Sequence, residues 1–296
     1  MRSFQGAVLF VDMLGFSALT RGKLPLGKEE FAPWQVDSEG EFPHQLLAAK
    51  ILIKFRKALM QTNKTFTGVR VAQLSDCAFL WSTDVGMIAD AGRHLMHEAA
   101  LMGLLCRGGL TFGDIHEPDK LNHSLGAFIV GDAVTRAASY EAMGKGMRIF
   151  TDQETASRVL KERPAEGFKP LVNPLTGDTI DEWQWYAPSQ SLLSAQNSSR
   201  LRKELERVVG CHTMLRYSPK LAWSATTLEG RRQIACSIVA VSDAMERLSG
   251  NSNEFLFTVE HLLSANPGRS DIVRQRVQQQ FVNELLTVIR PRRRSN

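Results

Sequence analysis

The chain has 296 residues, of which 43% are hydrophobic and 23% are charged, with a formal net charge of +5. These proportions are ordinary for a soluble globular protein. The positive charge suits a polyanionic substrate, although residues 290–294 supply much of it and also fit a solvated tail. No run reaches the roughly 18 apolar residues of a membrane helix, and no signal-like segment opens the chain. We therefore expect a cytoplasmic protein with no membrane or nucleic-acid partner.

The cysteines exclude two further classes of protein. No two of them form a C-x-x-C pair, so neither a zinc site nor a disulfide framework is indicated. Their scatter fits buried thiols in a reducing compartment. They are Cys77, Cys106, Cys211 and Cys236.

The first predicted strand ends at an acidic residue. Residues 7–11 form a short apolar run typical of a buried strand, and Asp12 follows it directly. A carboxylate beside apolar surface is costly unless it meets a cation or a donor. The backbone from Leu14 to Ser17, which turns through Gly15, can present N–H groups to an anion if it opens a helix. Acid and amides together indicate a metal ion and a phosphate, although a purely structural or capping aspartate fits the same pattern.

The next elements follow a glycine- and proline-rich segment, residues 21–41, which we interpret as a loop insertion. Residues 43–63 show helical periodicity with one wide apolar face. That face comprises Leu46, Leu47, Ile51, Ile53, Phe55, Leu59 and Met60. Strands at residues 69–74 and 77–81 come next, with Asp76 in the turn between them, and residues 87–104 form a second helix. The expected order β-α-β-β-α-β is the ferredoxin-like arrangement of the α+β class.

The sequence predicts two domains. The first, which contains the candidate catalytic residues, spans residues 1–188, and a helical extension with a basic tail spans residues 189–296. Strands at 107–117 and 126–131, joined by a loop at 118–124, extend the ferredoxin-like core as a hairpin. Then come a helix at 135–143, a strand at 147–150, a helix at 152–161 with Asp152 as N-cap, and strands at 168–172 and 182–186. The helices expected in the extension are 191–209, 228–248, 254–263 and 271–289.

Four segments, in order, resemble the class III nucleotidyl cyclases. They are the F-x-D-x-x-G-F-S stretch from Phe10 to Ser17, the hairpin around Asp76, the R-G-G-L-T-F-G strand from Arg107, and the strand-to-helix segment 126–138. The resemblance implies that Asp12 and Asp76 hold two Mg²⁺ or Mn²⁺ ions, with the Met13 carbonyl as a further ligand. It also implies a triphosphate cradle from the backbone N–H groups of Leu14, Gly15, Phe16 and Ser17, and a homodimer with shared active sites.

The sequence departs from this family at the positions that read a purine base. The lysine or glutamate expected four residues before the second aspartate is Ala72, and the acid or cysteine before the strand-to-helix glycine is Phe128. The transition-state asparagine and arginine correspond to Thr135 and Ser139. Arg136 and Arg107 are candidate replacements for the missing cation, although a surface salt bridge fits each of them better.

A class III core without purine determinants resembles the pyrimidine cyclases of the bacterial Pycsar anti-phage system. That resemblance implies conversion of UTP, or CTP, to the cyclic nucleotide plus pyrophosphate, with a separate effector downstream. Arg70, on the same strand face as Ala72, could donate to a uracil carbonyl, and Phe128 or Tyr140 could stack on the ring. For Phe128, plain core packing is the alternative.

Two other functions stay open at the level of sequence. One is an atypical adenylyl cyclase, and the other is a catalytically degenerate domain that binds a nucleotide or a partner. Two further features fit structural roles better than functional ones: the pair His94 and His97 with Glu98, and the Gly144-Lys145-Gly146 turn, which lacks a Walker pattern.

Overall fold

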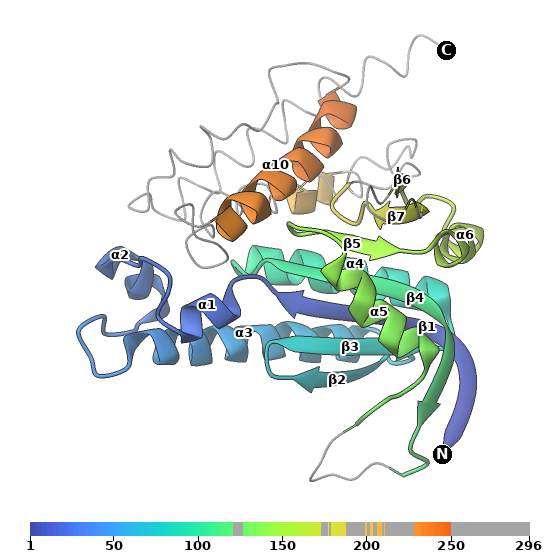
Figure 1. Cartoon of the computed structure of the whole chain (residues 1–296), viewed down its shortest axis with the longest axis horizontal. Coiled ribbons are helices and arrows are strands. Elements are labelled where there is room, and N and C mark those ends of the chain that lie inside the picture. The colour runs from blue at the N-terminus through green and yellow to red at the C-terminus, as the bar shows by residue number, and fades with distance from the viewer. Residues whose placement is uncertain are drawn as a thin grey trace.

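The computed structural model describes residues 1–120, 127–172, 177, 179–187 and 228–249, and the helical positions 199, 202, 203, 206–208 and 210. A sheet of seven strands forms its centre, in the order β2-β3-β1-β4-β5-β7-β6. The strands are β1 (Arg2–Met13), β2 (Arg70–Leu74), β3 (Cys77–Ser82), β4 (Cys106–Glu117), β5 (Ile149–Thr151), β6 (Phe168–Val172) and β7 (Thr179–Trp183). Figure 1 shows the helices arranged around this sheet.

The predicted α+β class and the β-α-β-β-α-β core are confirmed. The core runs from β1 through α3 (Pro43–Thr65), β2, β3 and α4 (Val85–Leu101) to β4. β1 lies between β3 and β4 and is antiparallel to both, which gives the ferredoxin-like order β2-β3-β1-β4. β5 then pairs in parallel with β4, and β7 and β6 complete the sheet.

Alternation along β1 divides the sheet into two faces. Leu9 and Val11 lie in the apolar core that contains Phe55 of α3 and Leu95 of α4. Val8 instead packs with Ala133 and Ala137 of α5 (Asp132–Ala142) on the other face. Because successive strand residues point to opposite faces, Asp12 shares the α5 face with Val8. The candidate acid therefore faces α5 and points away from α3 and α4.

Glycines on β4 let α5 approach the sheet closely. A Cβ on Gly109 would lie 2.0 Å from the Ala137 carbonyl oxygen and 2.8 Å from the Tyr140 Cβ. A Cβ on Gly113 would lie 2.8 Å from Arg136 Nη2. The R-G-G-L-T-F-G motif therefore has a packing role as well as its arginine, because a side chain at position 109 would collide with the backbone of the helix. At position 113 the Arg136 side chain would have to move.

Several predicted boundaries are corrected by the structure. The segment expected as a loop at 21–41 holds two short helices, α2 (Lys28–Phe31) and η1 (Ala32–Trp34), after α1 (Phe16–Thr20). In place of a strand at 126–131, residues 127–131 contribute one isolated bridge, from Val130 to His116. Helix α5 begins three residues earlier than predicted, and the last strand, β7, also begins three residues earlier. Helix α6 (Gln153–Glu162) has the predicted N-cap, because Asp152 accepts a hydrogen bond from the Thr155 N–H.

The wide apolar face predicted for the first long helix is wrong in one respect. Leu47, Ile51, Phe55 and Leu59 of α3 are buried. Leu46, Ile53 and Met60, placed on the same face by the sequence, are exposed instead. The long helix therefore carries apolar side chains toward solvent as well as toward the core.

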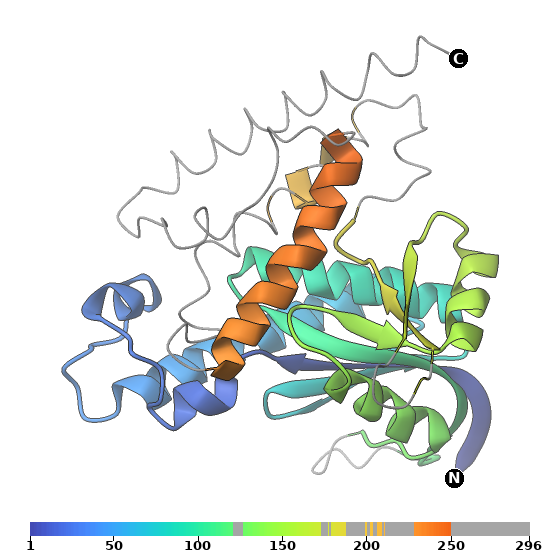
Figure 2. The same ribbon diagram turned by 45° about the horizontal axis from the view of Figure 1, so that its top comes forward.

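Helix α10 (Leu228–Ser249) confirms one predicted helix of the C-terminal extension and packs against the core. Ser237 accepts a hydrogen bond from the Met147 N–H at 3.0 Å, and Gln233 accepts one from the Gly146 N–H. Figure 2 shows this helix crossing beside the sheet. The helices predicted at 254–263 and 271–289 lie outside the described residues, and that at 191–209 is described only at single helical positions. Among the helices that the structure describes, none has the length and apolar character needed to span a membrane.

Candidate active site

An arginine joins two carboxylates at the end of the β1–β4 ladder. Asp12 lies directly opposite Arg107 in the antiparallel register. The Arg107 Nη2 atom is 3.4 Å from Asp12 Oδ2, and its Nε pairs with the carboxylate of Glu141 in the last turn of α5. The two strands and the helix thus bring Asp12, Arg107 and Glu141 into one cluster.

Asp76 reaches the same cluster from the β2–β3 turn. Ser75, beside it, adopts the left-handed conformation at φ 58°, which makes the turn tight. The Met13 N–H donates to the Asp76 carbonyl oxygen at 3.0 Å, so the backbone ties the two candidate metal segments together. The negative charge of Asp76 is close enough to raise the pKa of Asp12.

Negative charge is incompletely neutralised at this cluster. The pKa of Asp12 is raised to about 6, first by burial and then by the charges of Glu141 and Asp76, with Arg107 partly opposing them. The pKa of Glu141 is also raised by burial, against the opposing effect of Arg107 and Lys145. Burial and the same carboxylates raise the pKa of Cys77 to about 11, which keeps its thiol protonated and unsuited to nucleophilic attack.

These residues fit a hard divalent cation. Carboxylate oxygens are the ligands that Mg²⁺ and Mn²⁺ prefer, and a cation between Asp12 and Asp76 would relieve the repulsion that raises the Asp12 pKa. Within the described residues, no three His, Cys, Asp or Glu side chains gather to hold a metal. The protein would therefore supply two carboxylates, and the other ligands would come from backbone, substrate or water.

The predicted phosphate cradle begins with one N–H already in use. The Leu14 N–H donates to the Leu105 carbonyl oxygen at 2.8 Å, so this amide belongs to the fold. Gly15 caps α1 at φ 81°, a conformation that favours glycine. The N–H groups of Phe16 and Ser17 lie in the first turn of α1, where amides have no partner within the helix.

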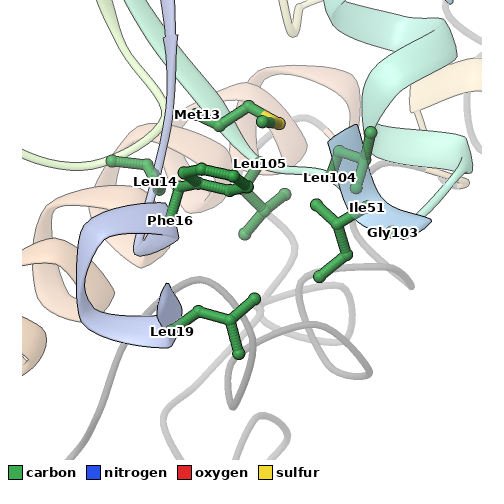
Figure 3. Close-up of a pocket in the computed structure, with 8 residues that line it drawn as sticks. All are labelled: Met13, Leu14, Phe16, Leu19, Ile51, Gly103, Leu104 and Leu105. Carbon is green, nitrogen blue, oxygen red and sulfur yellow. The ribbon is translucent and has the colours of Figure 1, made fainter. Parts of the chain in front are cut away.

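The side chains beneath this turn are apolar. Figure 3 shows apolar side chains from three parts of the chain around a small pocket. Its lining comprises Met13, Leu14, Phe16, Leu19, Ile51, Gly103, Leu104 and Leu105. It offers no polar side chain for a nucleotide, and we interpret it as the anchorage of α1 on α3 and on the start of β4.

The two arginine candidates have different surroundings. Arg136 donates to Asp132 at 2.7 Å, to Asp152 at 2.9 Å and to the Phe112 carbonyl oxygen at 2.7 Å. It links α5 to β4 and to the N-cap of α6, which is the salt-bridge alternative. Arg107 contacts Asp12 directly, so the structure brings Arg107 into the cluster and holds Arg136 in a separate one.

The predicted base-reading residues lie along β2 and the segment before α5. Arg70 is about half exposed and pairs with Glu117, and Ala72 is buried opposite Phe79. Phe128 is 52% exposed, which argues against the core-packing alternative. Thr135 and Ser139, at the transition-state positions, form hydrogen bonds near or within their own helix. The Thr135 hydroxyl donates to the Gly131 carbonyl oxygen, and the Ser139 hydroxyl donates to the Thr135 carbonyl oxygen.

Glu141 is the site residue that the sequence reasoning missed. A signal was present, because Ala133, Ala137 and Glu141 are spaced by four and share one helix face. The first two are small and pack on the sheet, so the third had to be a buried carboxylate in need of a partner. The histidines behave as expected of structural residues: His97 is buried with its pKa lowered to about 3, and its Nε2 lies 3.2 Å from the Trp185 carbonyl oxygen.

Comparison with known proteins gives structural similarity alone. No family model and no curated protein matches the sequence. The fold is similar to the adenylyl cyclase CyaB from P. aeruginosa, with a TM-score of 0.45 and 14% identity over 62% of this chain and 95% of that one. It is also similar to a bacterial light-regulated adenylyl cyclase (TM-score 0.43, 16% identity, 70% and 100% covered). A third is the guanylate cyclase domain of RhGC from Catenaria anguillulae in complex with GTP (TM-score 0.42, 16% identity, 62% and 97% covered).

Proposed function

We propose that the chain is a nucleotidyl cyclase. The observation that carries this proposal is the cluster at the end of the β1–β4 ladder, where Asp12 and Asp76 come together and one guanidinium is shared between Asp12 and Glu141. In the reaction, the ribose 3′-oxygen forms a bond to the α-phosphorus of a nucleoside triphosphate. The bond to pyrophosphate breaks, and the 3′-hydroxyl proton is lost.

Each residue of the cluster has a task in that reaction. Asp12 and Asp76 would hold two divalent cations, with the Met13 carbonyl as an additional ligand. When bound, such ions would supply Lewis-acid stabilisation of the α-phosphate and would lower the pKa of the 3′-hydroxyl. Arg107 donates to the phosphate oxygens, where negative charge grows as pyrophosphate leaves. The first-turn amides of α1, at Phe16 and Ser17, bind the triphosphate.

The preferred substrate in this proposal is UTP, with CTP second. Ala72 and Phe128 supply no polar partner to a purine, and loss of such partners commonly costs several orders of magnitude in sites built on them. Arg70 is half exposed and on the face of Ala72, so it can donate to a pyrimidine carbonyl, and uracil has two such acceptors. By resemblance to the Pycsar cyclases, the cyclic nucleotide would act on a separate effector in anti-phage defence in the bacterial cytoplasm.

The experiment is a competition among the four nucleoside triphosphates at equal concentration with Mn²⁺, with chromatographic identification of the cyclic product. We expect cyclic UMP. Asp12→Ala and Asp76→Ala should make none, whereas Asp119→Ala, which removes an exposed carboxylate beyond the end of β4, should behave as wild type. Cyclic AMP or cyclic GMP as the main product would show that the pyrimidine assignment is wrong.

One observation favours a second function, that of a catalytically degenerate nucleotide-binding domain. Arg107 forms ion pairs with both Asp12 and Glu141. A guanidinium held in this way can neutralise the two carboxylates in place of a metal ion. Under this alternative, the same assay yields no cyclic product from any triphosphate, while nucleotide binding is retained without Mn²⁺.

Shared sites in a homodimer are tested by complementation. Asp76→Ala removes a metal ligand, and a double replacement at Thr135 and Ser139 alters the α5 face assigned to the other subunit. Each variant alone should be inactive, and a mixture that has been unfolded and refolded together should regain activity through one intact site. Folded mixed dimers without activity would contradict shared sites.

A further inference from the structure

Helix α3 carries a line of large apolar side chains on its solvent face. Leu46, Ile53 and Met60 are 52%, 67% and 67% exposed. They are spaced by seven residues, close to two helical turns, so they stack along one edge of the helix. Phe42, the N-cap residue, continues the line and is 55% exposed. The inner face of α3 packs in the core, whereas this second apolar line is left exposed by the residues that the structure describes.

The same helix is strongly basic. Between Pro43 and Thr65 the sequence has five basic residues and no aspartate or glutamate. They are Lys50, Lys54, Arg56, Lys57 and Lys64. None of the five forms an ion pair with an acidic residue in the described ranges. Lys54 lies over the Trp34 ring, with Nζ 4.1 Å from the ring centroid. Within the described residues, the charges of Arg56, Lys57 and Lys64 are available to an external anion.

The basic residues flank the apolar line. Positions three and four residues away on a helix are neighbours of a given side chain. Lys50, Arg56 and Lys57 therefore surround Ile53, and Lys64 lies beside Met60. Lys50 also donates to the carbonyl oxygens of Trp34 and Gln35, which fixes α3 to the inserted segment. The result is an outer face of α3 on which apolar and basic side chains lie side by side.

We propose that this outer face of α3 binds the surface of an anionic lipid bilayer. Helices that lie in the membrane interface combine an apolar line with lysine and arginine, whose aliphatic stems follow the apolar side chains while the charged ends reach lipid phosphates. Clusters of four to eight basic residues recognise anionic lipids. A second copy of the same face is disfavoured, because it would oppose two helices of the same positive charge.

Lipid binding through α3 is compatible with the proposed catalysis and independent of it. Helices α3 and α5 cover opposite faces of the sheet (Figure 1). By alternation along β1, Asp12 points to the α5 face. Soluble substrate could thus reach the site of a membrane-bound molecule. The sequence-based expectation of no membrane partner rested on spanning segments, and a helix that lies on the bilayer surface has none.

The test is vesicle flotation of the full chain. We compare phosphatidylcholine vesicles with vesicles of phosphatidylcholine and phosphatidylglycerol, at low and high salt. We expect binding to the anionic vesicles only, weakened by salt. The double variant Arg56→Gln and Lys57→Gln should bind about thirtyfold more weakly, from about 1 kcal/mol for each charge. The double variant Ile53→Gln and Met60→Gln should bind the anionic vesicles at least about tenfold more weakly, since it removes two exposed apolar side chains.

The matched control replaces an exposed arginine and leucine of another helix, Arg158→Gln with Leu160→Gln on α6. It should bind vesicles as wild type does. Circular dichroism and thermal melts establish that all three variants fold, as expected for exposed positions. Absence of binding to anionic vesicles at low salt would overturn the proposal. The proposal would also be overturned if the Ile53 and Met60 variant bound anionic vesicles as tightly as wild type and duplex DNA fully displaced the protein from them. These two results together would show that the face attracts polyanions in general.

Discussion

The two ends of the β1–β4 ladder use the same residue types for opposite purposes. At one end Arg2 lies opposite Glu117, and at the other Asp12 lies opposite Arg107. Glu117 is almost fully buried, and it pairs with Arg2 and Arg70 and accepts the Trp81 indole N–H at 2.9 Å. There, two guanidinium groups and one indole surround a single carboxylate.

The Asp12 end has the reverse balance. One guanidinium is shared by Asp12 and Glu141, and Asp76 adds a third negative charge nearby. The pKa of Asp12 is raised to about 6, mainly by burial and secondarily by the charges of Glu141 and Asp76. The comparison indicates that the charge of Glu117 is balanced by two guanidinium groups and that this cluster stabilises the fold, whereas the Asp12 cluster is suited to an external cation.

The largest expected effect comes from Asp12→Asn. Removing a metal ligand should lower cyclase turnover with Mn²⁺ by about a thousandfold or more, since metal stabilisation is worth several kcal/mol in the transition state. Steady-state assays measure this loss. Because the variant also removes carboxylate repulsion, its melting temperature without metal should be equal to or higher than that of wild type. Turnover near the wild-type rate in a folded variant would contradict the metal assignment.

Glu117→Gln should break the opposite cluster and reduce stability with little effect on turnover. The substitution removes the charge that faces Arg2 and Arg70 and weakens the acceptor of the buried Trp81 N–H. Both arginines are about half exposed and can turn to water, so we expect a loss of about 2 to 3 kcal/mol in the free energy of unfolding. Urea denaturation measures it. Arg70, the proposed base-reading residue, loses its carboxylate partner in this variant, so the KM for UTP can change. The kcat per folded molecule should stay within about threefold of wild type, and a larger loss in kcat would show that this end also serves the chemical step.

The sequence predicted the Asp12 end better than the Glu117 end. Local patterns mark the residues of the Asp12 end. Apolar runs precede Asp12 and Arg107, and Asp76 lies in a tight turn, so each can be placed at the end of a strand from its own segment. The Glu117 cluster joins residues far apart in the chain, Arg2, Arg70, Trp81 and Glu117, and only strand register brings them together. Register depends on pairing across the whole sheet and cannot be read from one segment.

The same reasoning explains the missed and misplaced elements. Glu141 belongs to the site through the close approach of α5 to Gly109, a contact between segments that periodicity does not reveal. The strand expected at 126–131 has apolar residues, but among residues 127–131 the chain pairs only at Val130. On α3, periodicity gave the helix correctly but not the exposure of Ile53 and Met60, because a helix with two apolar lines looks like one with a wide face.

A smaller effect is expected from Glu141→Gln. The variant keeps the shape of the side chain but loses the charge that holds Arg107, and replacement of such supporting groups typically costs 10- to 100-fold in activity or metal affinity. We expect about a thirtyfold fall in kcat with a smaller change in KM for the nucleotide. Glu141→Asp should recover part of the loss. An equal loss in Glu154→Gln, where the carboxylate pairs with Arg158 on the surface of α6, would contradict a specific role for Glu141.

The smallest effect concerns the pH dependence of stability without metal. Burial raises the pKa of Asp12 from 3.8 to about 6, so between these values the folded state binds more protons at this group than the unfolded state does. Its contribution to stability is therefore greatest below about pH 4 and is lost as the pH rises through 6. We expect wild type to lose on the order of 1 to 2 kcal/mol in the free energy of unfolding relative to Asp12→Asn over this range, after allowance for solvent screening.

Paired urea titrations at several pH values measure the difference, and Mn²⁺ should restore the wild-type stability near pH 7. Parallel pH profiles for the two proteins would mean that Asp12 is already neutralised by Arg107, and the contrast between the two ends of the ladder would then disappear.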